Sequence, residues 1–144
     1  MIAIGSDHGG FALKAEIMEH LEKRGFAYQD FGTYSEESCD YPVYGRAVAK
    51  AVAAGEYEFG ILICGTGIGV SITANKVPGI RAALCGDCFS AQATREHNDA
   101  NILALGARVT GSGLALKIVD TFLDTPFSGE ERHARRISMI EESP

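Results

Sequence analysis

The sequence lacks several features that would place it in other classes of protein. Its N-terminus has no basic region followed by an apolar segment, so no secretory signal peptide is expected. No apolar run approaches the roughly 20 residues of a transmembrane helix, so no membrane partner is expected. A net charge of -6 argues against nucleic acid as a partner, because such a surface needs clustered positive charge. Four unevenly spaced cysteines without a signal peptide indicate reduced thiols and a cytoplasmic location.

Patterns for zinc binding and redox chemistry are also sparse. The motif Cys85-Gly-Asp-Cys88 has no second C-x-x-C and no His-x-x-x-His beside it, so a structural zinc site is poorly supported. A C-x-x-C at a strand-to-helix turn can carry out thiol–disulfide exchange. The simpler interpretation is that Asp87 caps a helix while both thiols pack. A redox function therefore stays open as a minor alternative, and any role of the two cysteines is undecided.

What the sequence does contain is an alternation of strand-like and helical patterns. Its 144 residues fit one domain, 1–144, and 46% hydrophobic residues suffice for a core. Ser128 and Glu131 form a capping-box pattern that predicts a C-terminal helix. The alternation predicts an α/β fold with a five-stranded parallel sheet covered on both faces. Strands are expected at 2–4, 26–31, 59–64, 81–85 and 102–105. A helix is expected after each of them, at 11–24, 42–54, 68–76, 88–97 and 112–124.

Ligands of such sheets bind beyond the carboxyl ends of the strands. The clearest strand ends there in Cys64-Gly-Thr-Gly-Ile-Gly69. Its glycines allow a tight turn and a close approach of ligand atoms to backbone N–H groups, and the next helix adds its positive dipole end. The turn can hold a phosphate or the oxyanion of a reacting sugar. It lacks the spacing of the dinucleotide motif and the lysine of a Walker loop, and a ligand-free turn is the alternative.

Cys64 and Thr66 are the two side chains of this turn that could take part in a reaction. A thiol beside exposed backbone N–H groups is favoured as the thiolate and can act as a base. The alternative is a buried cysteine that only fills space, which is the commoner fate of this residue type. The hydroxyl of Thr66 either faces the same pocket or caps the turn.

Three further clusters of polar residues could serve a site. Asp7 and His8 follow the first strand and can bind sugar hydroxyls or phosphate, although Asp7 can also cap a helix. His97 lies in a polar turn and can act as a general acid or base near neutral pH. Arg132 and Arg136 share a helix face and suit a phosphate, unless they form a solvated surface paired with nearby glutamates.

Together these motifs resemble the ribose-5-phosphate isomerase B family, which also includes galactose-6-phosphate isomerase subunits. The resemblance runs from about residue 2 to about residue 137. Several separate motifs in the same order are far more specific than any one of them. The matching segments are 5–10, 40–42, 64–69, 74–79, 96–101, 106–108 and 132–136.

The resemblance implies a Rossmann-like three-layer fold and a homodimer, or a tetramer, whose active sites lie at the subunit boundary. It implies no metal and no organic cofactor. It assigns carbon-proton transfer to Cys64, proton transfer between oxygens to Thr66 and ring opening to His97. Enediolate stabilisation falls to Gly65, Gly69 and Asn98, and Gly67 of the same turn is a further substrate-binding residue. Substrate and phosphate contacts fall to Asp7, His8, Tyr41, Arg108, Arg132, His133 and Arg136.

One departure separates branches of the family. Some relatives place a glutamate base just after the Gly-rich turn, where this chain has Val70. The thiol of Cys64 is therefore the expected base. The sequence predicts reversible isomerisation of ribose 5-phosphate to ribulose 5-phosphate. Alternatives are isomerisation of allose or galactose 6-phosphate, a non-catalytic phosphate-binding module, and the C-x-x-C redox protein.

Overall fold

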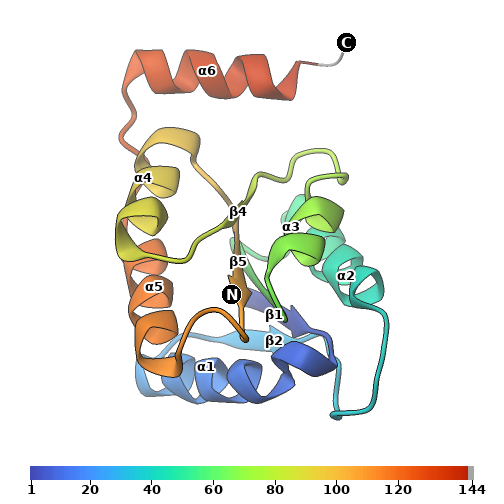
Figure 1. Cartoon of the computed structure of the whole chain (residues 1–144). Helices are drawn as coiled ribbons and strands as arrows, with labels where there is room; N and C mark the ends of the chain where they lie inside the picture. Colours follow the sequence, from blue (N-terminus) through green and yellow to red (C-terminus); the bar gives the residue numbers. More distant parts are fainter. Residues whose placement is uncertain (143–144) are drawn as a thin grey trace.

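A single parallel sheet forms the centre of the molecule. The computed structural model describes residues 1–142, and its strands follow the order β2-β1-β3-β5-β4 (Figure 1). All four pairings are parallel, as predicted. The two edge strands are shorter than the sequence suggested, because each pairs with one neighbour only. The strands are β1 (Ile2–Ser6), β2 (Tyr28–Asp30), β3 (Phe59–Cys64), β4 (Ala82–Leu84) and β5 (Ile102–Gly106).

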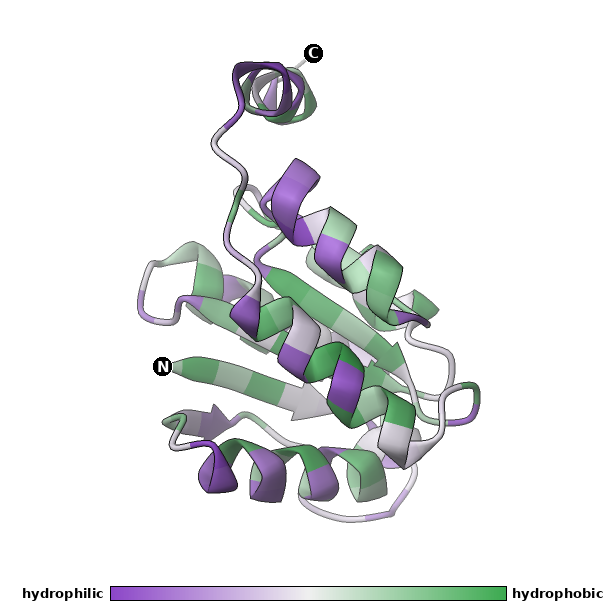
Figure 2. Cartoon of the chain, turned by 90° about the vertical axis from the view of Figure 1, so that its left-hand side faces the viewer, coloured by the Kyte–Doolittle hydropathy of each residue, from purple (hydrophilic) through white to green (hydrophobic). Residues whose placement is uncertain are grey.

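Helices cover both faces of the sheet and form the expected three layers. One face carries α1, α4 and α5, and the other carries α2 and α3 (Figure 1). Figure 2 looks onto the first face and shows helices lying over strands that are largely hydrophobic. The helices are α1 (Phe11–Lys23), α2 (Tyr41–Ala53), α3 (Ile68–Ala74), α4 (Cys88–Asn98), α5 (Ser112–Asp124) and α6 (Glu131–Glu141), and the 3-10 turn η1 is His8–Gly10.

The buried central strand β3 shows how the core positions the site. Its side chains alternate between the two faces because strand side chains have a period of two. Ile61 and Ile63 belong to the cluster beneath α1, α4 and α5, whereas Leu62 and Cys64 belong to the cluster beneath α2 and α3. Cys64 therefore ends β3 with its side chain on the face of the sheet that α2 and α3 cover.

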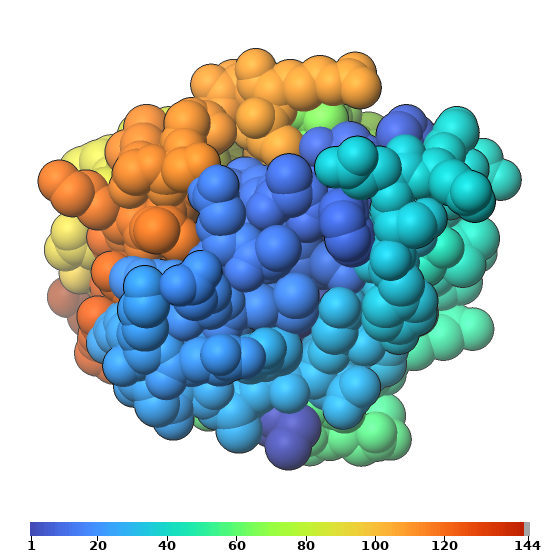
Figure 3. All heavy atoms as spheres, turned by 90° about the horizontal axis from the view of Figure 1, so that it is seen from below, coloured from blue at the N-terminus to red at the C-terminus, as the bar shows by residue number. Residues whose placement is uncertain are grey.

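The segments that follow β1 and β2 meet at one end of the molecule. Figure 3, seen from below, shows the blue N-terminal part of the chain between the cyan part, which follows β2, and the orange part, which includes α5. Lys14, whose side chain is fully buried, ties these segments together: its ammonium donates to Asp30 Oδ1 and to the carbonyl of Thr33, both at 2.6 Å.

The C-terminal helix α6 stands apart from the three layers and packs mainly against α4 (Figures 1 and 2). The predicted capping box is wrong, because α6 begins at Glu131 with Glu130 as its N-cap. Gly129, with a left-handed φ of 71°, keeps Ser128 outside the helix. The Ser128 hydroxyl instead accepts from the Glu130 N–H at 3.2 Å and binds His133 Nδ1 at 2.8 Å.

No helix within residues 1–142 is both long enough and apolar enough to cross a membrane.

Candidate active site

A cavity of about 390 Å³ opens at the carboxyl edge of the sheet, where the sequence placed the site. The ends of β1 and β3 and the starts of α2 and α3 meet there. Six of the predicted site residues line it together with two isoleucines that the sequence did not single out. The lining residues are Asp7, Tyr41, Cys64, Gly65, Thr66, Ile68, Gly69 and Ile72.

Cys64 is held beside the turn that follows it. Its side chain is almost fully buried, and the N–H of Gly67 donates to its sulfur at 3.1 Å. A backbone N–H aimed at sulfur stabilises negative charge there. Thr66 is exposed, and its hydroxyl oxygen accepts from the N–H of Ile68 at 3.2 Å. The hydroxyl therefore serves the turn and also borders the cavity.

Two glycines are required by the shape of the turn. Gly67 has a left-handed φ of 78° and is the N-cap of α3. A Cβ at Gly67 would lie 2.5 Å from Leu84 Cδ1 and 2.8 Å from the carbonyl carbon of Leu105. A Cβ at Gly69 would overlap the ring of Tyr41. Glycine at 69 thus lets the Tyr41 ring lie directly on the turn.

Asp7 and His8 approach from the end of β1. The Asp7 carboxylate caps η1 by accepting from the Gly10 N–H at 3.1 Å, so the capping interpretation is correct, and Asp7 also lines the cavity. His8 Nδ1 accepts from the Cys39 N–H at 3.2 Å. The neutral His8 ring consequently carries its proton on Nε2, which can donate to a ligand.

Arg108 stands beside the turn from the loop after β5. The backbone N–H of Arg108 donates to the carbonyl of Gly65 at 2.9 Å. Its exposed side chain passes close to Gly65, since a Cβ there would lie 3.5 Å from Arg108 Cδ and 3.6 Å from Nη1. A guanidinium at this rim can bind a phosphate or a sugar oxygen.

The remaining predicted site residues lie at the opposite edge of the sheet. His97 and Asn98 end α4, and the carbonyl of Asn98 accepts from Nε of Arg81, which immediately precedes β4, at 2.8 Å. Cys64 pairs with the last residue of β5. The five residues of β5 span about 13 Å between its ends. Within one chain, His97 therefore lies too far from Cys64 to share a substrate with it.

His133 of α6 lies against His97. The rings of His97 and His133 are 4.5 Å apart between centroids, with an interplanar angle of 39°. Burial lowers the pKa of His133, and the neighbouring His97, Arg132 and Arg136 lower it further, against the opposing effect of Glu130. Arg132 pairs with Glu130 at 2.8 Å, so part of the basic cluster is a solvated ion pair, as the alternative proposed.

Sequence reasoning also missed a buried arginine near the end of α4, Arg95. Arg95 donates from Nη1 to Asp99 Oδ1 at 2.8 Å and to the carbonyl of Ala100 at 2.7 Å, and from Nε to the carbonyl of Thr125 at 3.1 Å. Its guanidinium also lies 4.7 Å from the ring centroid of Phe59. The four-residue spacing of Arg95 and Asp99 was a signal that could have identified it.

The C-x-x-C motif does not have the features of a redox site. Asp87 caps α4 by accepting from the Ser90 N–H at 2.6 Å. Cys85 and Cys88 are both free thiols, and burial raises the pKa of Cys85 to about 11, which disfavours its thiolate. The packing interpretation is therefore correct for Cys85. Across residues 1–142, no three His, Cys, Asp or Glu side chains are grouped as a metal site requires.

Comparison with known proteins agrees with this geometry. The sequence pattern of the family described as Ribose/Galactose Isomerase matches residues 2–140. Ribose-5-phosphate isomerase B of Escherichia coli (strain K12) is 54% identical over 139 residues, covering 96% of this chain and 93% of that protein.

Solved structures extend the likeness to the whole fold. Ribose-5-phosphate isomerase B of Clostridium thermocellum is 60% identical, with a TM-score of 0.95, over 97% of this chain and 94% of the other. The enzyme of Mycoplasma genitalium, solved with bound ribulose 5-phosphate, is 44% identical, with a TM-score of 0.93, over 97% and 93% of the two chains. The motifs, the five-stranded sheet and these matches agree along almost the whole sequence. The chain therefore belongs to the ribose/galactose isomerase family.

Proposed function

We propose that this protein is an aldose–ketose isomerase that interconverts ribose 5-phosphate and ribulose 5-phosphate, with Cys64 as its base. The observation that carries the proposal is the Cys64 sulfur, which accepts from the Gly67 N–H at 3.1 Å in a cavity lined by Asp7, Tyr41 and Thr66. Relatives named ribose-5-phosphate isomerase B, one of them with bound ribulose 5-phosphate, support the choice of substrate. The whole chain acts as one domain in the cytoplasm, where its free thiols stay reduced.

The reaction starts with ring opening and continues through an enediolate. His97 transfers the proton between the ring oxygen and the C1 hydroxyl, which frees the aldehyde. The Cys64 thiolate removes the proton from C2, and the electron pair of that C–H bond forms the C1–C2 double bond. Cys64 then returns the proton to C1. Thr66 passes a proton from the C2 oxygen to the C1 oxygen, so the aldehyde becomes an alcohol and C2 becomes the ketone.

The negative charge of the enediolate requires preorganised hydrogen-bond donors. The N–H groups of Gly65 and Gly69 and the amide of Asn98 supply them, because a Gly-rich turn at a helix start points its N–H groups toward the cavity. Removing one such donor in other enzymes costs roughly 10²- to 10³-fold in rate. Asp7, His8 and Tyr41 bind the sugar hydroxyls.

We further propose that a second copy of the chain completes each site. Cys64 and His97 lie at opposite edges of one sheet, so neither edge alone carries the complete reaction. A two-fold homodimer that joins the carboxyl edge of one copy to the amino edge of the other forms two identical sites. His97 and Asn98 of the second copy then face Cys64. A tetramer made of two such dimers preserves this arrangement.

Exposed apolar side chains beside the cavity support this docking. Ile68 is 50% and Ile72 57% exposed, although both line the cavity. A neighbouring cavity of about 290 Å³ shares Ile68 with the first and adds Leu84 and Val109. Apolar surface of this kind around a polar site is typical of an interface between subunits.

The second copy also contributes the phosphate-binding groups. Arg132 and Arg136 lie four residues apart on α6. His133, between them in the sequence, packs against the His97 ring. Two guanidinium groups on one helix face suit the dianionic phosphate, and Arg108 of the first copy approaches from the other side of the cavity. Binding the remote phosphate orients the carbonyl end at Cys64.

A side-by-side assay on ribose 5-phosphate, allose 6-phosphate and galactose 6-phosphate, with a metal chelator present, tests the proposal. We expect fastest turnover of ribose 5-phosphate. Preference for a hexose phosphate would keep the mechanism and change the substrate, an outcome that the galactose branch of the family makes worth testing. Saturable binding without turnover on all three would contradict the enzyme proposal and favour a phosphate-binding module.

A further inference from the structure

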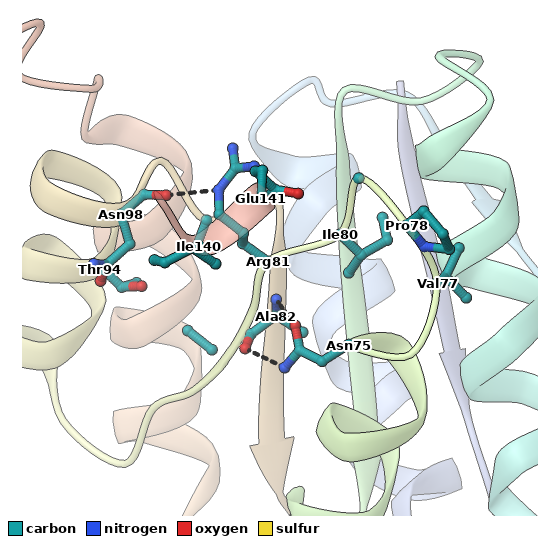
Figure 4. Close-up of a pocket in the computed structure, with 13 residues that line it drawn as sticks. Asn75, Val77, Pro78, Ile80, Arg81, Ala82, Thr94, Asn98, Ile140 and Glu141 are labelled. Atoms are coloured by element: carbon teal, nitrogen blue, oxygen red, sulfur yellow. Dashed lines mark hydrogen bonds and ion pairs between the residues drawn. The ribbon is translucent and has the colours of Figure 1, made fainter. Parts of the chain in front are cut away.

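Arg81 lies at the amino edge of the sheet and lines a third cavity, of about 460 Å³, that Figure 4 shows. This cavity is bordered by the loop before β4, by the end of α4 and by the end of α6. In Figure 4 the guanidinium of Arg81 points toward Asn98 on one side and lies beside Glu141 on the other. Neither the sequence motifs nor the proposed mechanism assigns a role to Arg81.

The guanidinium of Arg81 joins two separate elements. Nε donates to the carbonyl of Asn98 at 2.8 Å, and Nη2 donates to the carbonyl of Asp99 at 2.9 Å. Nη1 donates to Glu141 Oε1, at the C-terminal end of α6, at 2.7 Å. Both carbonyls belong to the turn that ends α4, in which Asp99 has a left-handed φ of 45°. One side chain thus holds the Asn98 turn and α6 at the same time.

Arg81 is itself fixed to the sheet. Its N–H donates to Asn101 Oδ1 at 2.9 Å, and its carbonyl accepts from the N–H of Asn101 at 3.0 Å. Asn101 comes immediately before β5, so these two hydrogen bonds fix the Arg81 backbone beside that buried strand. The side chain of Arg81 is only 18% exposed. The guanidinium is therefore a rigid link from the sheet to both elements rather than a mobile surface group.

We propose that Arg81 is a positioning residue that fixes where the Asn98 turn and α6 lie relative to each other. The inference rests on the proposed function, in which Asn98 stabilises the enediolate and α6 binds the phosphate. Arg81 acts on the chemical step through the Asn98 and Asp99 carbonyls, and on phosphate binding through Glu141. These two effects are separable, because different nitrogen atoms of the guanidinium make them.

Two substitutions separate the two effects. Arg81→Lys keeps a positive charge near Glu141 but cannot donate to two carbonyls in fixed geometry. We expect kcat to fall about 10-fold with KM within roughly 2-fold, since small misplacements of catalytic groups are costly. Glu141→Ala removes only the ion pair between Arg81 and α6 and leaves both carbonyl hydrogen bonds of Arg81 in place. We expect it to raise KM roughly 2- to 5-fold with kcat unchanged, because a partly exposed ion pair contributes little.

The matched control is Arg24→Lys, at an arginine that binds two carboxylates of α5 and none of the groups that Arg81 binds. Arg24 pairs with Asp120 at 2.9 Å and with Asp124 at 2.8 Å, between α1 and α5. We expect it to leave kcat and KM unchanged. Thermal unfolding and sedimentation of each variant show whether the fold and the subunit assembly are intact before kinetics are compared.

A clean split, with kcat lowered by Arg81→Lys and KM raised by Glu141→Ala, supports the proposal. Equal kcat and KM in both variants and in the unchanged protein would overturn it, as would a change that simply follows loss of stability or assembly. If Arg81→Lys fails to fold, Glu141→Ala decides alone: an unchanged KM overturns the link to α6. Failure of the proposed function is distinguishable, because the unchanged protein would then turn over none of the sugar phosphates.

Discussion

The two edges of the sheet carry the two halves of the proposed site, and they are built differently. At the carboxyl edge, Cys64 and its Gly-rich turn belong to the buried core and to the start of α3. At the amino edge, α6 packs mainly on α4 and is held by single side chains such as Arg81 and His133. The edge that we propose transfers the carbon proton is therefore preorganised by backbone and packing. The edge that we propose binds the phosphate is held by ion pairs and hydrogen bonds between side chains, so single substitutions there can be used to test it.

The largest expected effect comes from removing the proposed base at the carboxyl edge. Cys64→Ala leaves the fold intact and lowers kcat by roughly 10²- to 10⁴-fold, as expected for loss of a positioned base. Turnover of ribose 5-phosphate measures it. The matched control is Cys88→Ala, which we expect to leave turnover unchanged. Normal turnover in Cys64→Ala would reject this thiol as the base, and loss of turnover in Cys88→Ala would revive the redox alternative.

Mixing inactive variants tests whether the two edges come from different copies. Cys64→Ala and His97→Ala are each expected to be nearly inactive. After denaturation and refolding together, half of the dimers carry one variant of each kind, and each of these has one intact site. Activity should then return to about one quarter of that of the unchanged protein, if the dimer is two-fold and sites are independent. No recovery, with dimers present by sedimentation, would contradict a shared site.

A smaller effect separates backbone strain from steric overlap in the Gly-rich turn. Gly67 and Gly79 both have left-handed φ, of 78° and 88°, but of the two only Gly67 has neighbours within 4 Å of the position that a Cβ atom would occupy. Gly79→Ala is expected to cost about 1 kcal/mol of stability, from strain alone. Gly67→Ala should cost more and also lower kcat, because Leu84 and the Cys64 turn must shift. Denaturant unfolding and turnover measure both, and equal losses would contradict the packing argument.

The smallest effect concerns the pH dependence of the amino edge. The pKa of His133 is lowered in the folded protein by burial and by His97, Arg132 and Arg136. The unfolded chain therefore binds the proton more readily. The stability that the neutral ring contributes is present above its unfolded pKa of about 6.5 and is lost as pH falls through the folded value. The thermal midpoint should drop between pH 7.5 and pH 5.5.

His133→Gln provides the control for this pH effect. It should be less stable at pH 7.5 but should show a smaller drop toward pH 5.5. His20→Gln is the matched substitution at a histidine that binds Asp120 at 2.7 Å, between α1 and α5. An identical pH slope in the unchanged protein and in His133→Gln would show that His133 is not the group responsible.

Local patterns predicted the elements well and the caps less well. The strands and the first helix were predicted from their apolar residues, since burial of one face imposes a period on them. The C-terminal helix was predicted from Ser128 and Glu131 instead. The edge strands β2 and β4 came out shorter, because pairing with one neighbour ends before the apolar run does. The capping box at Ser128 failed because Gly129 turns the chain away from the helix axis.

The sequence alone determined the parallel sheet, the carboxyl-edge cavity and the Gly-rich turn at Cys64. These features depend on neighbours in the chain: a strand end, the next loop and the start of the next helix. Only the tertiary structure decided that His97 and the arginines of α6 lie at the other edge, since the direction of α4 relative to β5 sets their distance from Cys64. It alone also revealed Arg81 and Arg95, whose partners become neighbours only when the chain is folded.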